Sequence, residues 1–224
     1  MANSKVVVYG LSTEGYAIAS QMAIKGADVY IIDESNPSAI SLKAEIAKIY
    51  PNVSSLKEDE PLLAMEPIDV AISKAQYLFF TPRVRKTGQD IKTEIHSKFK
   101  DAVSSVKKNS GVIYTLPTGF GGNNENISLL EHVTGLEIGK QISYFYYPLE
   151  NIEYQPKIIG SFNAKEDPKL AELLATGKKE KKFVAISSSE HFHAINVLSR
   201  FSSLCSILEV CKYAQDETTK TDLS

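Results

Sequence analysis

Short apolar runs rich in Val, Ile and Tyr alternate with helical patterns along most of the chain, and this alternation limits the fold more than any other feature. The first apolar run covers residues 5–9 and the first helical pattern covers residues 14–25. Continuous apolar strands joined by helices are typical of a parallel sheet that is covered on both faces. The sequence therefore predicts an α/β fold: a Rossmann-type, doubly wound and mostly parallel sheet, followed by one long C-terminal helix.

The other expected elements continue this pattern. We expect strands at residues 28–32, 77–81, 112–116, 142–147, 157–159 and 183–186, and helices at residues 38–49, 90–107, 123–134 and 168–175. The net charge of −2 provides no basic face, which argues against nucleic acid as a partner. No apolar run approaches the roughly 20 residues needed to cross a bilayer, and the start of the chain carries no secretory signal. We expect a cytoplasmic protein without a membrane segment.

The last helical pattern spans residues 187–214 and carries an apolar stripe. The stripe contains Ile195, Leu198, Phe201, Cys205 and Leu208, and is widened by Phe192, Leu204 and Ile207. A helix of this length must bury its stripe against its own domain or against a second copy, and we expect a homodimer formed through it. Cys205 and Cys211 are not spaced as metal ligands, so we expect buried thiols. The polar residues 215–224 are expected to be a disordered tail.

The turn after the first strand reads G-L-S-T-E-G, which is close to a dinucleotide-binding loop. Gly10 suits the tight turn and Gly15 the close packing of helix on strand, while Ser12 replaces the middle glycine. The Ser12 hydroxyl can bond a phosphate oxygen, but the Glu14 carboxylate competes with an anion for the helix N-terminus. Asp33, at the end of the second strand, suits the ribose 2′-hydroxyl and excludes a 2′-phosphate. The expected cofactor is therefore NAD rather than NADP, held by Gly10, Leu11, Ser12, Thr13, Glu14, Gly15 and Asp33; the alternative is a retained fold with an impaired site.

Three later segments carry further motifs at the ends of the expected strands. They are "FFTPR" after the third main strand, "GVIYTLPTGF" over the fourth and "YFYYPLENI" over the fifth. Together with "GLSTEG" they resemble the N-terminal half of the UDP-glucose/GDP-mannose dehydrogenases, and the closing helix resembles that family's central dimerisation helix. The resemblance implies that Thr81 and Pro82 border the cofactor and that Thr115 occupies the place of the catalytic threonine, also beside the cofactor. It implies a Rossmann-like NAD-binding domain over residues 1–186 and a dimerisation helix over residues 187–214.

The sequence departs from the family at the catalytic positions. Leu149 stands where the family has its catalytic glutamate, and Glu150 follows one residue late. His193 occupies the place of the catalytic lysine. The sequence ends after the helix, so the family's C-terminal domain with its nucleophilic cysteine has no counterpart in it. Because that thiol holds the intermediate of the second oxidation, we do not expect two-step oxidation from this chain alone.

Other polar motifs allow functional and structural interpretations. In "HFH", His191 and His193 diverge by about 200° around a helix, so one is expected to face the sheet and the other solvent, without a metal. Arg83 or Arg85 follows a strand end and can meet a phosphate, or can belong to a solvated loop. The "GFGGNN" turn at residues 119–124 can offer backbone N–H groups to an anion, or form a flexible lid.

Two functional hypotheses remain open. The first is an NAD-binding, dehydrogenase-like oxidoreductase that acts on a sugar nucleotide or small alcohol, with Thr115 orienting the substrate and His193 or Glu150 as the base. The second is a non-catalytic nucleotide-binding or dimeric scaffold protein. The missing glutamate, lysine and cysteine favour the second for chemistry, whereas Asp33 and the two glycines favour retention of the ligand.

Overall fold

The structure of the chain is a computed structural model that describes residues 4–35, 38–49, 65–84, 90–149, 158–175 and 181–221. Within these residues nine strands form one sheet with the order β4-β3-β2-β1-β5-β6-β7-β8-β9. The five central strands are parallel neighbours. They are β1 (Lys5–Tyr9), β2 (Asp28–Ile32), β5 (Tyr77–Phe80), β6 (Gly111–Tyr114) and β7 (Ser143–Tyr146). This arrangement confirms the expected mostly parallel α/β sheet.

The two sides of the sheet are completed by strands of mixed direction. At one side, β3 (Ser38–Leu42) and β4 (Met65–Pro67) are each antiparallel to their neighbour. At the other side, β8 (Ile158–Ser161) runs antiparallel to β7, and β9 (Lys182–Ala185) pairs parallel to β8. The carboxyl ends of β1, β2, β5, β6 and β7 therefore share one edge of the sheet, where open α/β folds bind ligands.

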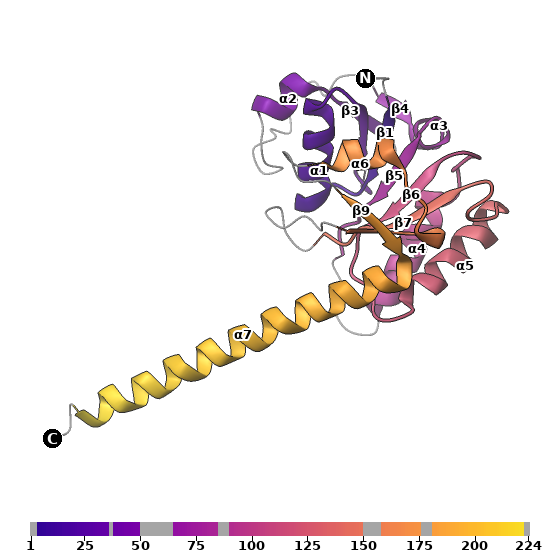
Figure 1. Cartoon of the computed structure of the whole chain (residues 1–224). Helices are drawn as coiled ribbons and strands as arrows, with labels where there is room; N and C mark the ends of the chain where they lie inside the picture. The colour runs from indigo at the N-terminus through magenta and orange to yellow at the C-terminus, as the bar shows by residue number, and fades with distance from the viewer. Residues whose placement is uncertain are drawn as a thin grey trace.

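Helices cover both faces of the sheet (Figure 1). One core cluster joins the sheet to α1 (Thr13–Ile24), α2 (Ala44–Ile49) and α6 (Pro168–Leu174). The second joins it to α3 (Ile68–Ser73), α4 (Asp90–Val103) and α5 (Gly122–Thr134). The central strands are buried on both sides, because their apolar side chains alternate between these two clusters. A short 3-10 turn, Phe162–Ala164, follows β8.

The prediction of a single helix over residues 38–49 was wrong. The segment begins with β3 and forms only the short helix α2 after Lys43. In β3, Leu42 pairs with Val29 and Ala39 with Ile32 of the neighbouring strand. The free edge of β2 thus takes up this segment, and sheet pairing outweighs its local helical preference. The strand β4 and helix α3 were not expected from the sequence.

The last helix, α7 (Ile186–Thr221), leaves the sheet domain as a single rod (Figure 1). It is longer than expected and includes part of the segment expected to be disordered, so the predicted helix end at residue 214 was wrong. No glycine or proline interrupts residues 215–221, and an established helix adds further residues at little cost. Among the side chains of α7 that the structure describes, the buried ones are Ser189, Glu190 and His193, in the first turns of the helix.

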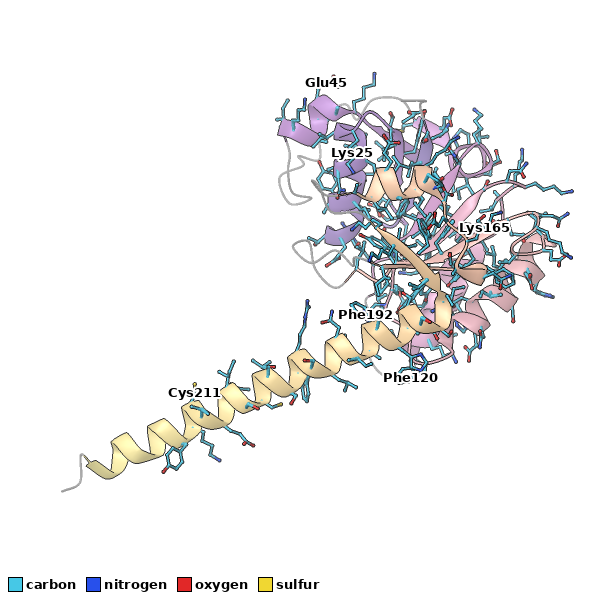
Figure 2. The ribbon with its side chains drawn as sticks, in the orientation of Figure 1. Lys25, Glu45, Phe120, Lys165, Phe192 and Cys211 are labelled. Atoms are coloured by element: carbon cyan, nitrogen blue, oxygen red, sulfur yellow. The ribbon has the colours of Figure 1, made fainter. Side chains whose placement is uncertain are left out.

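From residue 197 to residue 213 the side chains of α7 are exposed to solvent in the single chain. Figure 2 shows Cys211 on the outer part of the helix, with no other element of the chain beside it. Cys205 and Cys211 are both exposed, so the expectation of buried thiols was wrong for one copy of the chain. The exposed apolar side chains of the helix are Phe192, Ile195, Val197, Leu198, Phe201, Leu204, Ile207, Leu208, Val210 and Tyr213.

Among the described residues, one helix is long and apolar enough to cross a membrane by length and composition alone. It is the segment Ile186–Tyr213. The most apolar window of this segment has a mean hydropathy of 1.3, and no residue of that window is buried. The expectation that no such segment exists was therefore wrong. Arg200 and several serines interrupt the apolar run, yet the average over the window remains apolar.

Candidate functional site

The candidate dinucleotide site begins where β1 turns into α1. Gly10 has a φ of +108°, which only glycine adopts readily. A Cβ atom at Gly10 would lie 2.1 Å from the carbonyl oxygen of Thr81, and one at Gly15 would lie 2.4 Å from the Thr81 hydroxyl oxygen. The two glycines therefore let the turn pack directly against the end of β5, in agreement with the roles expected for them in the sequence.

Thr81 and Pro82 form the buried wall beneath this turn. The Thr81 hydroxyl lies 3.1 Å from the carbonyl oxygen of Gly10 and 3.2 Å from that of Tyr9. The backbone N–H of Thr81 donates to the same Tyr9 carbonyl at 2.8 Å. Thr81 is only 2% exposed. It thus shapes the loop by holding its backbone in place.

Ser12 is the N-cap of α1. Its hydroxyl oxygen accepts a hydrogen bond from the backbone N–H of Gly15 at 2.9 Å, which satisfies one of the N–H groups that a helix leaves open at its start. The Ser12 O–H can still donate to a ligand. Thr13 is exposed and Glu14 half-buried, and their backbone N–H groups have no acceptor within the described part of the chain. The loop therefore retains donors for an anion.

Asp33 and Glu34 follow β2 at the same edge and differ in their partners. Asp33 is half-buried, and one of its carboxylate oxygens accepts the backbone N–H of Ser35 at 3.1 Å. Its other oxygen can accept a ribose hydroxyl. The Glu34 carboxylate lies 2.5 Å from the ammonium of Lys98 and accepts the backbone N–H of Arg83 at 2.8 Å. Glu34 is thus part of the framework, whereas Asp33 has acceptor capacity left.

Thr115 lies at the carboxyl end of β6 and is 2% exposed. Its hydroxyl donates to the carbonyl oxygen of Phe80 at 2.6 Å, so toward a ligand this group can act only as an acceptor. The backbone N–H of Leu149 donates to the Thr115 carbonyl at 2.8 Å. Leu149 packs against the core cluster beneath α1. Glu150, the expected alternative base, lies outside the described residues, as does Arg85.

The turn before α5 is occupied by a side chain of the protein itself. The buried carboxylate of Glu190 accepts the backbone N–H of Gly121 at 2.9 Å and that of Asn123 at 3.0 Å. It also accepts the side-chain amide of Asn123 at 2.7 Å, and the Tyr144 hydroxyl donates to the other end of this amide at 2.6 Å. The interpretation of this turn as a free anion site was therefore wrong. The sequence analysis did not predict that Glu190 accepts these hydrogen bonds. The available signal was the start of α5, where Gly121 has no side chain that could cap the helix, so that another acceptor is needed.

The two histidines of "HFH" face different surroundings, as expected. His193 is 7% exposed, and its ring meets that of Tyr146 edge-on with centroids 6.3 Å apart. His191 is exposed, and its ring lies 4.7 Å from that of Phe120, measured between centroids. Tyr146 is paired with Tyr114 in the sheet, one residue before Thr115. His193 and Thr115 therefore both lie near the carboxyl ends of β6 and β7.

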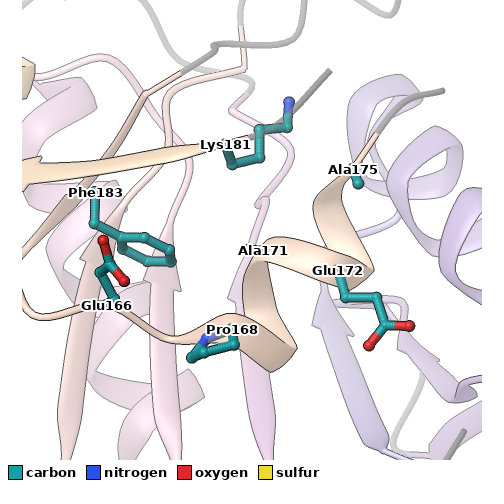
Figure 3. Close-up of a pocket in the computed structure, with 7 residues that line it drawn as sticks. All are labelled: Glu166, Pro168, Ala171, Glu172, Ala175, Lys181 and Phe183. Carbon is teal, nitrogen blue, oxygen red and sulfur yellow. The ribbon is translucent and has the colours of Figure 1, made fainter. Parts of the chain in front are cut away.

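A lysine–tyrosine pair at the same edge was also missed by sequence reasoning. The ammonium of Lys181 donates to the Tyr147 hydroxyl at 2.8 Å. Tyr147 follows β7 and is completely buried, and this burial raises the pKa of its phenol. Lys181 also lines a hollow of about 410 Å³ between α6 and β9 (Figure 3). The residues around the hollow are Glu166, Pro168, Ala171, Glu172, Ala175, Lys181 and Phe183, none of which was expected to bind the cofactor.

Metal ligation has no counterpart in the described part of the chain. There, no three His, Cys, Asp or Glu side chains are grouped so that they could hold a metal ion. The polar groups that the described residues bring to the candidate site are the donors at the turn from Ser12 to Gly15, an acceptor at Asp33, and Thr115 and His193 farther along the edge.

The fold is a Rossmann-type α/β sheet, similar to that of solved dehydrogenases and reductases, some of which were solved with NADPH. Among similar solved structures, GDP-mannose dehydrogenase from Pseudomonas aeruginosa matches with a TM-score of 0.64 and 13% identity, over 89% of this chain and 50% of its own. UDP-D-ManNAc dehydrogenase from Pyrococcus horikoshii matches with a TM-score of 0.57 and 18% identity, over 83% of this chain and 48% of its own.

A reductase with the same type of fold is also similar to this chain. The reductive aminase from Aspergillus terreus, solved with NADPH and ethyl levulinate, has a TM-score of 0.56 and 15% identity, over 92% of this chain and 63% of its own. No protein-family model and no curated protein matches the sequence. At these identities the similarity establishes the fold, and the chain spans about half the length of the sugar-nucleotide dehydrogenases it matches.

Proposed function

We propose that this chain binds NAD at the carboxyl edge of its sheet and is a dehydrogenase-like oxidoreductase acting on a sugar nucleotide or small alcohol. The observation that carries the proposal is the turn from Gly10 to Gly15, which packs so closely on Thr81 that neither glycine has room for a Cβ atom. Such a turn aims the first N–H groups of α1 at the space above the sheet edge, where a pyrophosphate is bound in folds of this type.

The residues present fit a dinucleotide in donors and acceptors. Ser12, Thr13 and Glu14 supply a hydroxyl and backbone N–H groups for the pyrophosphate, and Asp33 supplies an acceptor for a ribose. Because the Asp33 carboxylate would repel a 2′-phosphate, we assign the site to NAD rather than NADP. The Glu14 carboxylate opposes anion binding at the helix N-terminus, so we expect moderate rather than tight affinity.

Bound NAD would supply hydride-transfer chemistry, and the chain's own residues would handle the substrate. Thr115 would accept a hydrogen bond from a substrate hydroxyl, since its own proton is given to Phe80. His193, or Glu150, would take up the proton of the alcohol. Leu149 provides no carboxylate at the position where the resembling family has one, so we propose a single oxidation or reduction step rather than a two-step oxidation.

We also propose that the chain forms a homodimer through α7. The helix exposes ten large apolar side chains over its length, and an apolar surface of this extent is a typical protein contact. The alternative function, a non-catalytic nucleotide-binding or dimeric scaffold protein, is favoured by the same exposed helix together with the missing glutamate and lysine.

The experiment for the cofactor site is calorimetric titration of the purified chain with NAD and NADP. We expect heat from NAD and weaker binding of NADP. Asp33→Asn retains an acceptor but removes the charge, so it should narrow the difference between the two dinucleotides. Asp69→Asn, in the first turn of α3, is the matched control. Absence of binding to either dinucleotide would reject the cofactor site and leave the scaffold function.

A further inference from the structure

Arg83 follows the strand β5 and lies across the turn from β1 to α1. Its side-chain Nε–H donates to the backbone carbonyl of Leu11. Its backbone is fixed on both sides, because its N–H donates to Glu34 at 2.8 Å and its carbonyl oxygen accepts from Lys98. The guanidinium therefore makes one direct contact with the phosphate loop, and two further contacts hold the backbone of Arg83 in place.

The charge of this guanidinium is not neutralised by the described residues around it. Lys98 is paired with two carboxylates, those of Glu34 at 2.5 Å and Glu94 at 2.9 Å. Arg83 has no ion pair within the described part of the chain, and only one of its five N–H donors has an acceptor there. A half-buried cation in this state favours an anionic ligand.

Ser12 stands at the middle position of the loop, where a dinucleotide-binding loop has glycine, and this substitution weakens the anion site beside Arg83. Ser12 uses its oxygen to cap the N–H of Gly15, which removes one backbone donor from those available to a pyrophosphate. Glu14 adds negative charge at the same helix terminus. A guanidinium that reaches the loop from β5 would offset both losses, because charge-assisted hydrogen bonds are stronger than those from neutral donors.

We propose that Arg83 binds the pyrophosphate of the dinucleotide and compensates for the altered loop. This inference rests on the proposed cofactor site and deepens it. It assigns the anion-binding charge to the residue after Pro82 rather than to the loop between β1 and α1. Arg83 is thus a binding residue for the phosphates, and Asp33 remains the binding residue for the ribose.

The test compares Arg83→Gln with Lys100→Gln, which removes an equal charge from an exposed position on α4. Titrations use NAD, NADP, ADP-ribose and adenosine, with thermal unfolding as a check that each variant is folded. We expect Arg83→Gln to weaken NAD and ADP-ribose by about ten- to a hundredfold and to leave adenosine unchanged. Because one phosphate contact is lost, the dependence of NAD affinity on salt should also decrease. Lys100→Gln should change neither the affinity for NAD nor its dependence on salt.

The second part of the test addresses the role of Ser12. Ser12→Gly frees the N–H of Gly15, so Arg83→Gln should cost less affinity in that background than in the wild-type chain. Equal NAD affinity of wild type and Arg83→Gln would overturn the inference alone. A loss confined to NADP would overturn it too, by placing the guanidinium on a 2′-phosphate. No NAD binding by the wild-type chain would reject the cofactor site and the inference together.

Discussion

The carboxylate of Glu190, in the first turns of α7, lies 2.7 Å from the side-chain amide nitrogen of Asn123 at the start of α5. The two residues are 67 positions apart in the sequence. With the backbone N–H groups of Gly121 and Asn123, this contact fixes the base of the long helix to the sheet domain. It also places His193 one turn farther along, against Tyr146.

Removal of the Glu190 carboxylate should destabilise the domain. Glu190→Ala leaves three N–H donors without their acceptor, two of them on the buried Asn123, and we expect a loss of about 2–4 kcal/mol in the free energy of unfolding. Urea denaturation measures it. Glu209→Ala, on the exposed part of the same helix, should change stability by about 0.5 kcal/mol at most. Equal effects of the two substitutions would show that the network around Asn123 contributes no net stability.

The contact between the loop and β5 should not tolerate a methyl group. Gly15→Ala would place its Cβ 2.4 Å from the Thr81 hydroxyl oxygen and 2.5 Å from the Gly10 carbonyl oxygen. We expect the loop to shift at a cost of about 1–3 kcal/mol, together with weaker NAD binding. Gly119→Ala is the control, because nothing lies within 4 Å of its added methyl group. A Gly15→Ala chain with wild-type stability and affinity would contradict the close packing.

Stability should fall at alkaline pH through buried phenols. Burial, aided by the Glu34 and Asp101 carboxylates, raises the pKa of Tyr9 to about 12 from the 10.0 of an open phenol. The folded chain therefore holds this proton more tightly than the unfolded chain. The resulting stability is complete below pH 10 and is lost as the pH rises toward 12, with about 1 kcal/mol lost by pH 11.

Tyr9→Phe should accordingly lose less stability between pH 9 and pH 11 than the wild-type chain. Urea unfolding at both pH values measures the difference. Tyr213→Phe, on the exposed part of α7, should follow the wild-type curve. If Tyr9→Phe followed it too, the phenol of Tyr9 would not differ between the folded and unfolded chains.

The exposed face of α7 should control the oligomeric state. In sedimentation velocity under reducing conditions, we expect a dimer of the wild-type chain and a monomer of the double variant Phe201→Glu with Leu204→Glu. The variant Ser202→Glu with Ser206→Glu adds the same charge to another side of the helix and should remain dimeric. A monomeric wild-type chain would reject the dimer, and its flotation with lipid vesicles would instead identify a membrane as the partner of α7.

The sequence by itself determined the elements that depend on local patterns. The run at residues 5–9, the two glycines of the loop and Asp33 after the second strand predicted the parallel sheet and its candidate site. Their physical basis lies within a few residues of each position: the alternation of apolar side chains, the φ angle of Gly10 and the capping of α1 by Ser12.

Only the tertiary structure decided what depends on distant partners. Residues 38–42 became a strand because β2 offered a free edge, and the donors before α5 were taken by Glu190 from a helix that starts 64 residues later in the chain. Likewise, Arg83 lies over Leu11, 72 positions away. No local sequence pattern predicts that these residues come into contact. The order of the strands in the sheet determines which strand ends and edges become neighbours.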